Sequence, residues 1–166
     1  MALVACSPTG APTEAPRTKA CSTPEHRALD FWVGDWDVRG VKQRPDAPPS
    51  RSRISLVEGG CVVLEEYSNP SGYSGRSLNA YDPERKRWEQ FWVDNQAGVH
   101  HYIGHARDGN MYYEAESVRF PELPQPVKVK MTFFNKGPDE VRQLIEQSTD
   151  GTSFTTLYDL TYRRRR

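Results

Sequence analysis

A chain of 166 residues is long enough to form one domain with a substantial hydrophobic core. Its 22 basic residues balance 22 acidic residues, so no overall field draws the protein to nucleic acid or to an anionic membrane surface. No stretch approaches the ~20 consecutive apolar residues of a membrane-spanning helix. We therefore expect a soluble domain with no nucleic-acid partner, and we interpret the basic run 163–166 as a solvated chain end.

Residues 1–22 are predicted to be the remnant of an export signal followed by a flexible tether. Residues 3–6, Leu-Val-Ala-Cys, have the form of a bacterial lipobox, in which a small residue precedes a cysteine that receives a lipid. Residues 7–19 are rich in proline, threonine and alanine and poor in hydrophobes, as in a tether. We expect a protein of the bacterial cell envelope, periplasmic or held at the membrane only through a lipid on Cys6.

An export signal also needs a basic segment and an apolar segment of roughly 7 to 15 residues before the cysteine. Only five residues precede Cys6, so the signal is incomplete as written. Our hypothesis is that the natural gene encodes the missing part upstream of Met1, and the alternative is an accidental match over residues 3–6. The DNA upstream of Met1 decides between them, because the hypothesis requires an in-frame apolar segment there.

Two cysteines, Cys21 and Cys61, form an even pair once Cys6 is set aside for lipid. Disulfides persist in the oxidising envelope, so we expect a bridge between these two residues. The bridge would close a loop of about 40 residues and stabilise the fold by about 3 to 4 kcal/mol in the chain-entropy model. Two separate thiols are the alternative.

The first regular element is predicted to be a short helix over Thr23–Trp32. Thr23 is a suitable N-cap, Pro24 suits the first helical position, and Glu25 lies in the first turn. The rest of the domain, which we place at residues 23–166, is expected to be all-β.

From Trp36 onward, residues alternate with a period of two and turn residues recur at regular intervals, which predicts about ten strands in hairpin succession. Because nearly all links are of hairpin length, we expect a closed antiparallel meander β-barrel, in which no strand edge is exposed. Longer loops at 44–50 and 118–126 leave a β-sandwich as the alternative. The predicted strands are Trp36–Val41, Ser52–Val57, Cys61–Tyr67, Tyr73–Tyr81, Trp88–Asp94, Val99–His105, Met111–Ser117, Val127–Phe134, Val141–Ser148 and Phe154–Arg163.

Gly34, Asp35 and Trp36 form a G-x-W motif at the beginning of the first strand, after the short helix. This motif resembles the signature of the calycins, which comprise the lipocalins and related barrels. In lipocalins the tryptophan packs across the barrel floor, and an arginine late in the chain stacks on it. The resemblance implies that Trp36 has this structural role and that Arg163, at the end of the last predicted strand, supplies the arginine.

Four stretches extend the resemblance: HRALDFWVGDWDV from His26, GRSLNAYD from Gly75, WEQFWVD from Trp88 and EQSTDG from Glu146. Together they resemble a bacterial family of uncharacterised, often secreted, calycin-like proteins, the DUF1579 type. The resemblance covers roughly residues 21 to 163. It implies an antiparallel barrel and no particular activity.

Candidate binding residues are sought on the strand faces that carry the tryptophans and tyrosines, which we assign to the barrel interior. Several polar side chains share these faces, and each unpaired buried amide or carboxyl costs about 1 to 3 kcal/mol. They indicate either a polar ligand among aromatic rings or, as the alternative, a water-filled barrel whose amides bond one another. The predicted ligand-binding residues are Glu65, Tyr67, Ser77, Asn79, Gln90, Trp92, His101, Gln143 and Tyr158.

The histidines predict no metal site, and we expect no cofactor. His101 and His105 share a strand face but lie about 13 Å apart along it, and His100 points to the opposite face. Haem, by analogy with the ten-stranded barrel of nitrobindin, would need an axial histidine near the chain end, and no histidine follows His105.

Three classes of function remain. A binding barrel would hold a small amphipathic or aromatic molecule between Trp92, Tyr67 and Tyr158, with Glu65 and neighbouring amides fixing its orientation. An enzyme of isomerase or cyclase type would use the same cavity, with Glu65 and His101 as an acid–base pair. A structural or partner-binding protein would use the barrel only as a scaffold. We favour the binding barrel, although a fold does not by itself imply a function.

Overall fold

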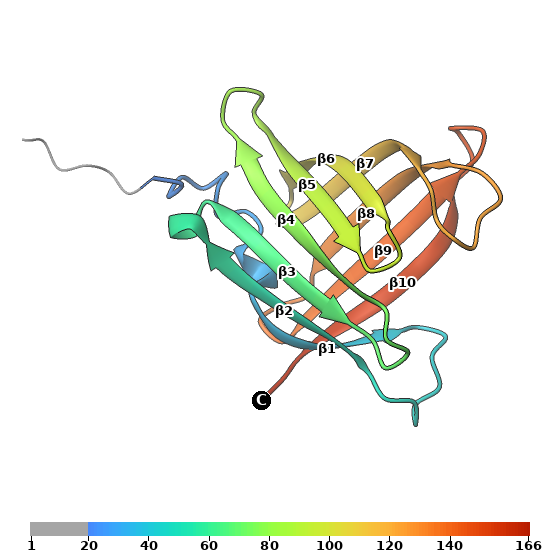
Figure 1. Ribbon diagram of the computed structural model, residues 1–166. Coiled ribbons are helices and arrows are strands. Elements are labelled where there is room, and N and C mark those ends of the chain that lie inside the picture. The colour runs from blue at the N-terminus through green and yellow to red at the C-terminus, as the bar shows by residue number, and fades with distance from the viewer. Residues whose placement is uncertain (1–19) are drawn as a thin grey trace, which may run out of the picture.

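Ten antiparallel strands each pair with the next along the chain, and the last pairs with the first, so the sheet closes on itself. The computed structural model describes residues 20–166 (Figure 1). Two single turns of 3-10 helix accompany the strands, η1 (Asp30–Trp32) and η2 (Glu58–Gly60). The strands are β1 (Gly34–Gly40), β2 (Ser50–Val57), β3 (Val62–Ser68), β4 (Ser74–Asp82), β5 (Arg87–Asp94), β6 (Val99–Arg107), β7 (Asn110–Val118), β8 (Val127–Asn135), β9 (Glu140–Ser148) and β10 (Thr155–Arg164).

Closure of the sheet confirms the predicted ten-stranded meander barrel and excludes the sandwich. β1 pairs with β2 on one side and with β10 on the other, so Trp36 lies between Ser52 and Arg164. A sandwich would leave two separate sheets with free edges. Within residues 20–166, no helix is long and apolar enough to cross a bilayer.

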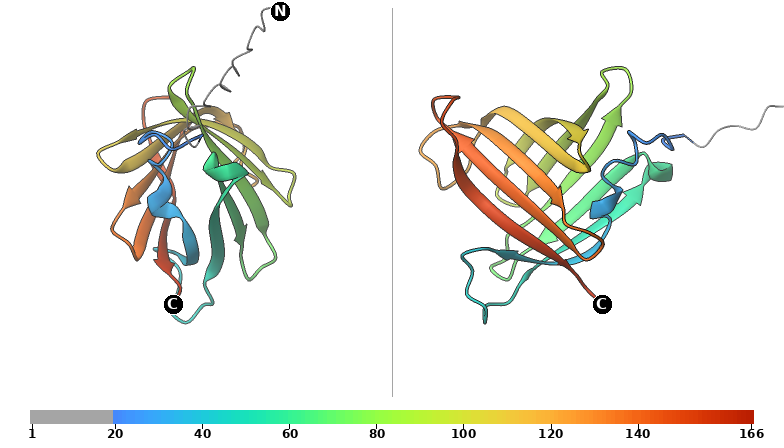
Figure 2. Two further views of the ribbon diagram at one scale, coloured as in Figure 1. Left: turned by 90° about the vertical axis from the view of Figure 1, so that its left-hand side faces the viewer. Right: turned by 180° about the vertical axis from the view of Figure 1, so that it is seen from behind.

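The two ends of the barrel differ because consecutive antiparallel strands place alternate links at the same end. The N-terminal segment reaches one end together with the links β2–β3, β4–β5, β6–β7 and β8–β9, and we call this end the floor (Figure 2). The opposite end, which we call the mouth, carries the links 41–49, 69–73, 95–98, 119–126 and 149–154.

The predicted helix over Thr23–Trp32 does not form as such. This segment makes successive turns, most of whose backbone hydrogen bonds join residues three apart, and only η1 is a turn of regular helix. Thr23, the expected N-cap, bonds the ring of His26 with its hydroxyl group. Because Leu29 and Trp32 are fully buried, packing against the barrel determines the path of the segment and overrides its helical signals.

The predicted disulfide between Cys21 and Cys61 is confirmed. Cys61 directly follows η2, so the bond ties the N-terminal segment to the link between β2 and β3. The predicted lipidation site Cys6 and the tether up to residue 19 lie outside the described residues.

Trp36 is fully buried at the floor, and the arginine that stacks on it is Arg164. The central guanidinium carbon of Arg164 lies 4.2 Å from the centroid of the Trp36 ring, and the indole nitrogen donates a hydrogen bond of 2.8 Å to the carbonyl of Trp32. The prediction of Arg163 was wrong by one residue. Arg163 lies opposite Asp37, and its side chain is 75% exposed, because one step along a strand reverses the face.

Large side chains fill the floor half of the barrel. The largest fully buried side chains are Trp32, Trp36, Trp88, Tyr113, Tyr162 and Phe133. Gly104 admits one of these rings, because a Cβ at this position would lie 2.4 Å from the ring of Tyr113. With the floor half filled, open volume is left toward the mouth.

Candidate functional site

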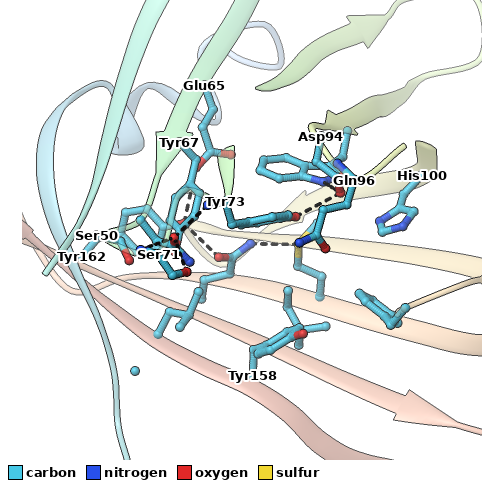
Figure 3. A pocket seen from close by; sticks show the side chains of 18 of the residues that line it. Ser50, Glu65, Tyr67, Ser71, Tyr73, Asp94, Gln96, His100, Tyr158 and Tyr162 are labelled. Atoms are coloured by element: carbon cyan, nitrogen blue, oxygen red, sulfur yellow. Dashed lines mark hydrogen bonds between the residues drawn. The ribbon is translucent and has the colours of Figure 1, made fainter. Parts of the chain in front are cut away.

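The barrel encloses a cavity of about 680 Å³, within the range of roughly 300 to 1,000 Å³ typical of small-molecule sites. Inner-face residues of eight strands and residues of the mouth links line it. Figure 3 shows Asp94, Gln96 and His100 on one side of the cavity and Ser50 and Tyr162 on the other. The aromatic lining residues are Tyr67, Tyr73, Trp92, Tyr102, Phe120, Tyr158 and Tyr162.

Glu65 lies at the inner end of the cavity, where three hydroxyl groups donate hydrogen bonds to its carboxyl oxygens. Ser52 and Tyr162 bond one oxygen at 2.7 and 3.4 Å, and Ser77 bonds the other at 3.1 Å. Glu65 is only 4% exposed. Strand alternation places it on the inner face of β3, directly opposite Ser77 on β4, while β2 and β10 supply the other donors.

Asn79 extends this polar network across the inner faces of β4 and β5. Its amide nitrogen donates to the hydroxyl of Ser77 at 3.0 Å, and its amide oxygen accepts from Gln90 at 2.7 Å and from Tyr113 at 3.1 Å. Because the Ser77 oxygen already accepts from Asn79, its own hydrogen is available for Glu65. The chain of donors therefore ends at the Glu65 carboxyl group, and the network is satisfied within the protein.

Burial raises the pKa of Glu65 from 4.5 to about 7. The hydrogen bonds from Ser52, Ser77 and Tyr162 act in the opposite direction and offset only part of this effect. Among residues 20–166, no lysine or arginine lines the cavity, so no cation there favours the ionised form. The carboxyl group therefore titrates near neutral pH.

Gln143 joins the network through Tyr162, whose single hydroxyl hydrogen is shared between the Gln143 amide oxygen at 2.9 Å and the more distant Glu65 oxygen at 3.4 Å. The Gln143 amide nitrogen meets the sulfur of Met131 at 3.1 Å. A thioether is a weak acceptor, so this amide keeps donor capacity that a ligand oxygen would use better.

Tyr67, Tyr73 and Trp92 lie together nearer the mouth, and we call these three rings the aromatic wall. Their ring centroids lie 6.2 to 6.3 Å apart, in tilted and edge-on arrangements. Gly75 makes room for the aromatic wall, because a Cβ at this position would lie 2.2 Å from the Trp92 ring.

Asp94 fixes the outer edge of the aromatic wall. One carboxyl oxygen accepts from the Trp92 indole nitrogen and the Tyr73 hydroxyl, both at 3.0 Å, and the other accepts the backbone N–H groups of Gln96 and Gly98. Partial burial acts to raise the pKa of Asp94, but these hydrogen bonds outweigh it and lower the pKa below its usual value. Asp94 is therefore ionised at neutral pH.

The structure corrects the position of His101, which lies on the outer face of β6. Register sets the faces: His100 lies opposite the inward Trp92, and His101 lies opposite the outward Phe91. The His101 ring stacks on Phe91 and bonds Glu89, away from the cavity. His101 therefore neither lines the cavity nor forms the acid–base pair with Glu65 that the enzyme hypothesis required.

His100 lines the cavity in its place. Its Nε2 lies 3.1 Å from the carbonyl oxygen of Arg119, so this nitrogen carries the hydrogen, and Nδ1 faces the Tyr102 hydroxyl at 3.4 Å. Burial lowers the pKa of His100, partly opposed by the bond to Arg119. At neutral pH its ring is therefore uncharged.

Tyr158 lies at the mouth, where it is 37% exposed. Its hydroxyl group donates to Glu122 from the link between β7 and β8, and its ring packs edge-on against Phe120 of the same link. The predicted contact residue is thus at the rim of the cavity.

The structure brings most of the predicted residues together and adds others. Glu65, Ser77, Asn79 and Gln90 form one network, Gln143 joins it, Tyr67 and Trp92 lie in the aromatic wall, and Tyr158 lies at the rim. The prediction missed Ser52, Tyr73, Asp94, His100, Tyr102, Tyr113 and Tyr162. Tyr73 and Tyr162 already stood on faces assigned to the interior, which is the signal that would have found them.

The protein is therefore a closed antiparallel β-barrel with an internal pocket that is open at one end. The Glu65 network lies at the inner end of this pocket, and the aromatic wall lies nearer the mouth. The chain belongs to the family described as "Protein of unknown function (DUF1579)", whose model matches residues 22–164, as the resemblance indicated. No curated protein is significantly similar to the chain. In the described part of the chain, no three histidine, cysteine, aspartate or glutamate side chains are grouped as metal ligands would be.

Proposed function

We propose that the protein binds a small amphipathic or aromatic molecule inside the barrel. The observation that carries this proposal is the cavity of about 680 Å³ with an aromatic wall on one side and the Glu65 network at its inner end. Such a site buries an apolar body against rings and fixes its orientation through a few polar groups. Because the network is satisfied before any ligand enters, its geometry is set in advance.

We also propose that the protein works outside the cytoplasm, in the bacterial envelope. The disulfide between Cys21 and Cys61 supports this location, because such bonds persist in oxidising compartments. A lipid anchor at Cys6 belongs to the same proposal. Metabolic labelling with a fatty-acid probe, of the protein joined to a complete signal, tests the anchor, and loss of label in Cys6→Ser is the expected result.

A fluorescence titration tests ligand binding directly. N-phenyl-1-naphthylamine, a neutral apolar reporter, should bind the wild type with saturable, enhanced emission. Ile145→Trp fills the cavity and should abolish the signal, whereas the matched control Val93→Trp, at a position 50% exposed on β5, should retain it. Equal binding by both variants would contradict the proposal, provided that circular dichroism shows both to be folded.

A second candidate, a cofactor-independent enzyme, is favoured by one observation. The pKa of Glu65, at about 7, suits a general acid or base acting at neutral pH. Glu65→Gln separates the two functions, because it should weaken binding of a ligand modestly but abolish turnover of a substrate. The compounds to assay are those that displace the reporter.

A further inference from the structure

The charged groups that line the cavity are all of one sign. Three carboxyl groups face it, from Glu65 at the inner end, Asp94 beside the aromatic wall and Glu122 at the rim, and no lysine or arginine lines it in the described part of the chain. His100 contributes no charge at neutral pH, because burial disfavours its protonated form. The site therefore lacks any group that would hold an anionic ligand.

Two of these carboxyl groups have hydrogen-bond donors but no counter-ion. Glu65 receives only hydroxyl groups, and Asp94 receives hydroxyl, indole and backbone N–H groups. Neither forms an ion pair with a residue in 20–166. Buried charges in proteins are normally paired, and the ionised form of Glu65 has no cation beside it in the described residues.

The polarity of the network points to the same conclusion. Hydrogens run from Gln90 and Tyr113 to Asn79, from Asn79 to Ser77, and from Ser77 to Glu65. The hydroxyl groups of Ser52 and Ser77 both donate to the carboxyl group, which has capacity for about four hydrogen bonds. The carboxyl group can therefore accept a further hydrogen bond, and a donor can reach it only from the cavity.

Aromatic faces near the carboxyl groups suit a cation as well as an apolar body. A ring carries negative charge on its face, so an ammonium group within about 6 Å of a ring centre is attracted to it. The aromatic wall and the rings of Tyr102 and Tyr162 line the route from the mouth to Glu65.

We propose that the ligand is an amphipathic amine, whose protonated nitrogen pairs with Glu65 while its apolar body lies against the aromatic wall. This inference rests on the proposed binding function and specifies the chemical class of the ligand. It excludes fatty-acid-like and other carboxylate ligands, which would place a further negative charge beside Glu65 and Asp94.

Competition against the reporter with three matched compounds tests the inference at pH 7.5. The compounds are 2-(1-naphthyl)ethylamine, 2-(1-naphthyl)ethanol and 1-naphthylacetate, which share a ring system and carry a positive charge, no charge and a negative charge. The amine should displace N-phenyl-1-naphthylamine about tenfold more strongly than the alcohol, and the carboxylate should be weakest. Equal potency of amine and alcohol, or preference for the carboxylate, would overturn the inference without affecting the proposed binding function.

Variants then locate the charge. Glu65→Gln should remove most of the amine's advantage over the alcohol, whereas Glu66→Gln, on the outer face of β3 beside Arg76, should leave it intact. An undiminished advantage in Glu65→Gln would overturn the assignment to Glu65. Failure of the reporter to bind the wild type at all would instead reject the binding function itself. The comparison of the three compounds on the wild type stands even if Glu65→Gln does not fold.

Discussion

Replacing Glu65 by glutamine removes a carboxyl group whose burial makes stability depend on pH. In the folded protein the pKa of Glu65 is about 7, against an ordinary pKa of 4.5 for an exposed glutamate. Between these two values the folded state binds more protons at this site than the unfolded state does. Stability from this site is therefore highest at acidic pH and falls as the pH rises from about 4.5 through 7.

The magnitude follows from the difference of the two pKa values. Because proton binding and folding are linked, these two pKa values make the free energy of unfolding of the wild type fall by about 2 to 3 kcal/mol between pH 5 and pH 8, relative to a protein without the Glu65 carboxyl group. No solvent screening reduces the effect, because Glu65 is only 4% exposed and no cation lines its surroundings in the described residues.

Urea unfolding of the wild type and Glu65→Gln at pH 5, 6, 7 and 8 measures the effect. The difference between their free energies of unfolding should shift by about 2 to 3 kcal/mol across this range, in favour of the variant at high pH. Glu66→Gln, whose carboxylate is exposed and paired with Arg76, should show no such shift. A constant difference between wild type and Glu65→Gln from pH 5 to 8 would show that burial does not raise the pKa of this carboxyl group.

Three further tests probe the fold around the cavity. The double variant Cys21→Ser with Cys61→Ser opens a loop of sequence separation 40 and should lower the free energy of urea unfolding by about 4 kcal/mol. A loss below about 1 kcal/mol would show that the disulfide constrains the unfolded chain little. Arg164→Ala should cost about 1 to 2 kcal/mol in the same assay, whereas the exposed Arg163→Ala should cost less than about 0.5, and the reverse order would contradict the stacking assignment. Gly75→Ala places a Cβ 2.2 Å from the indole ring of Trp92, so it should lower the free energy of unfolding by about 1 to 3 kcal/mol and also weaken binding of the reporter. An unchanged reporter affinity would show that the Trp92 ring does not bound the cavity.

The strand pattern was enough to predict the barrel and the inner faces of β3, β4, β5 and β9. Period-two alternation decides which face a residue joins, and turn residues such as Asn69 and Asp150 show where each hairpin reverses. Alternation alone therefore identifies Glu65 and Asn79 as interior polar residues. It does not predict the contacts between them, because the register between strands depends on turn geometry.

Two predictions, those for His101 and Arg163, were wrong because a shift of one residue along a strand reverses the face to which a side chain points. On β6, Val99 and Ile103 share the face of His101 and are apolar yet lie outside, 72% and 37% exposed, so the strand pattern favoured the wrong face for His101. At the end of β10, successive arginines carry no alternation at all. In both places pairing with a neighbouring strand determines the face, and sequence patterns of a single strand do not contain that information.

The helix predicted before β1 failed for a different reason. Its capping signals are local, whereas the burial of Leu29 and Trp32 and the disulfide at Cys21 act over long sequence distances. Tertiary contacts routinely override weak helix propensity in so short a segment.

A native mass spectrum of the protein, purified gently from an exporting bacterial host, is the sharpest test of whether the barrel holds a ligand. We expect a reproducible additional mass that is lost on denaturation, has the composition of a small amine, and is absent from Ile145→Trp prepared in the same way. The denatured protein should be two hydrogens lighter than its fully reduced form because of the disulfide. A bare protein mass, unchanged after incubation with the host's small-molecule extract, would contradict the proposal that the barrel is a binding site.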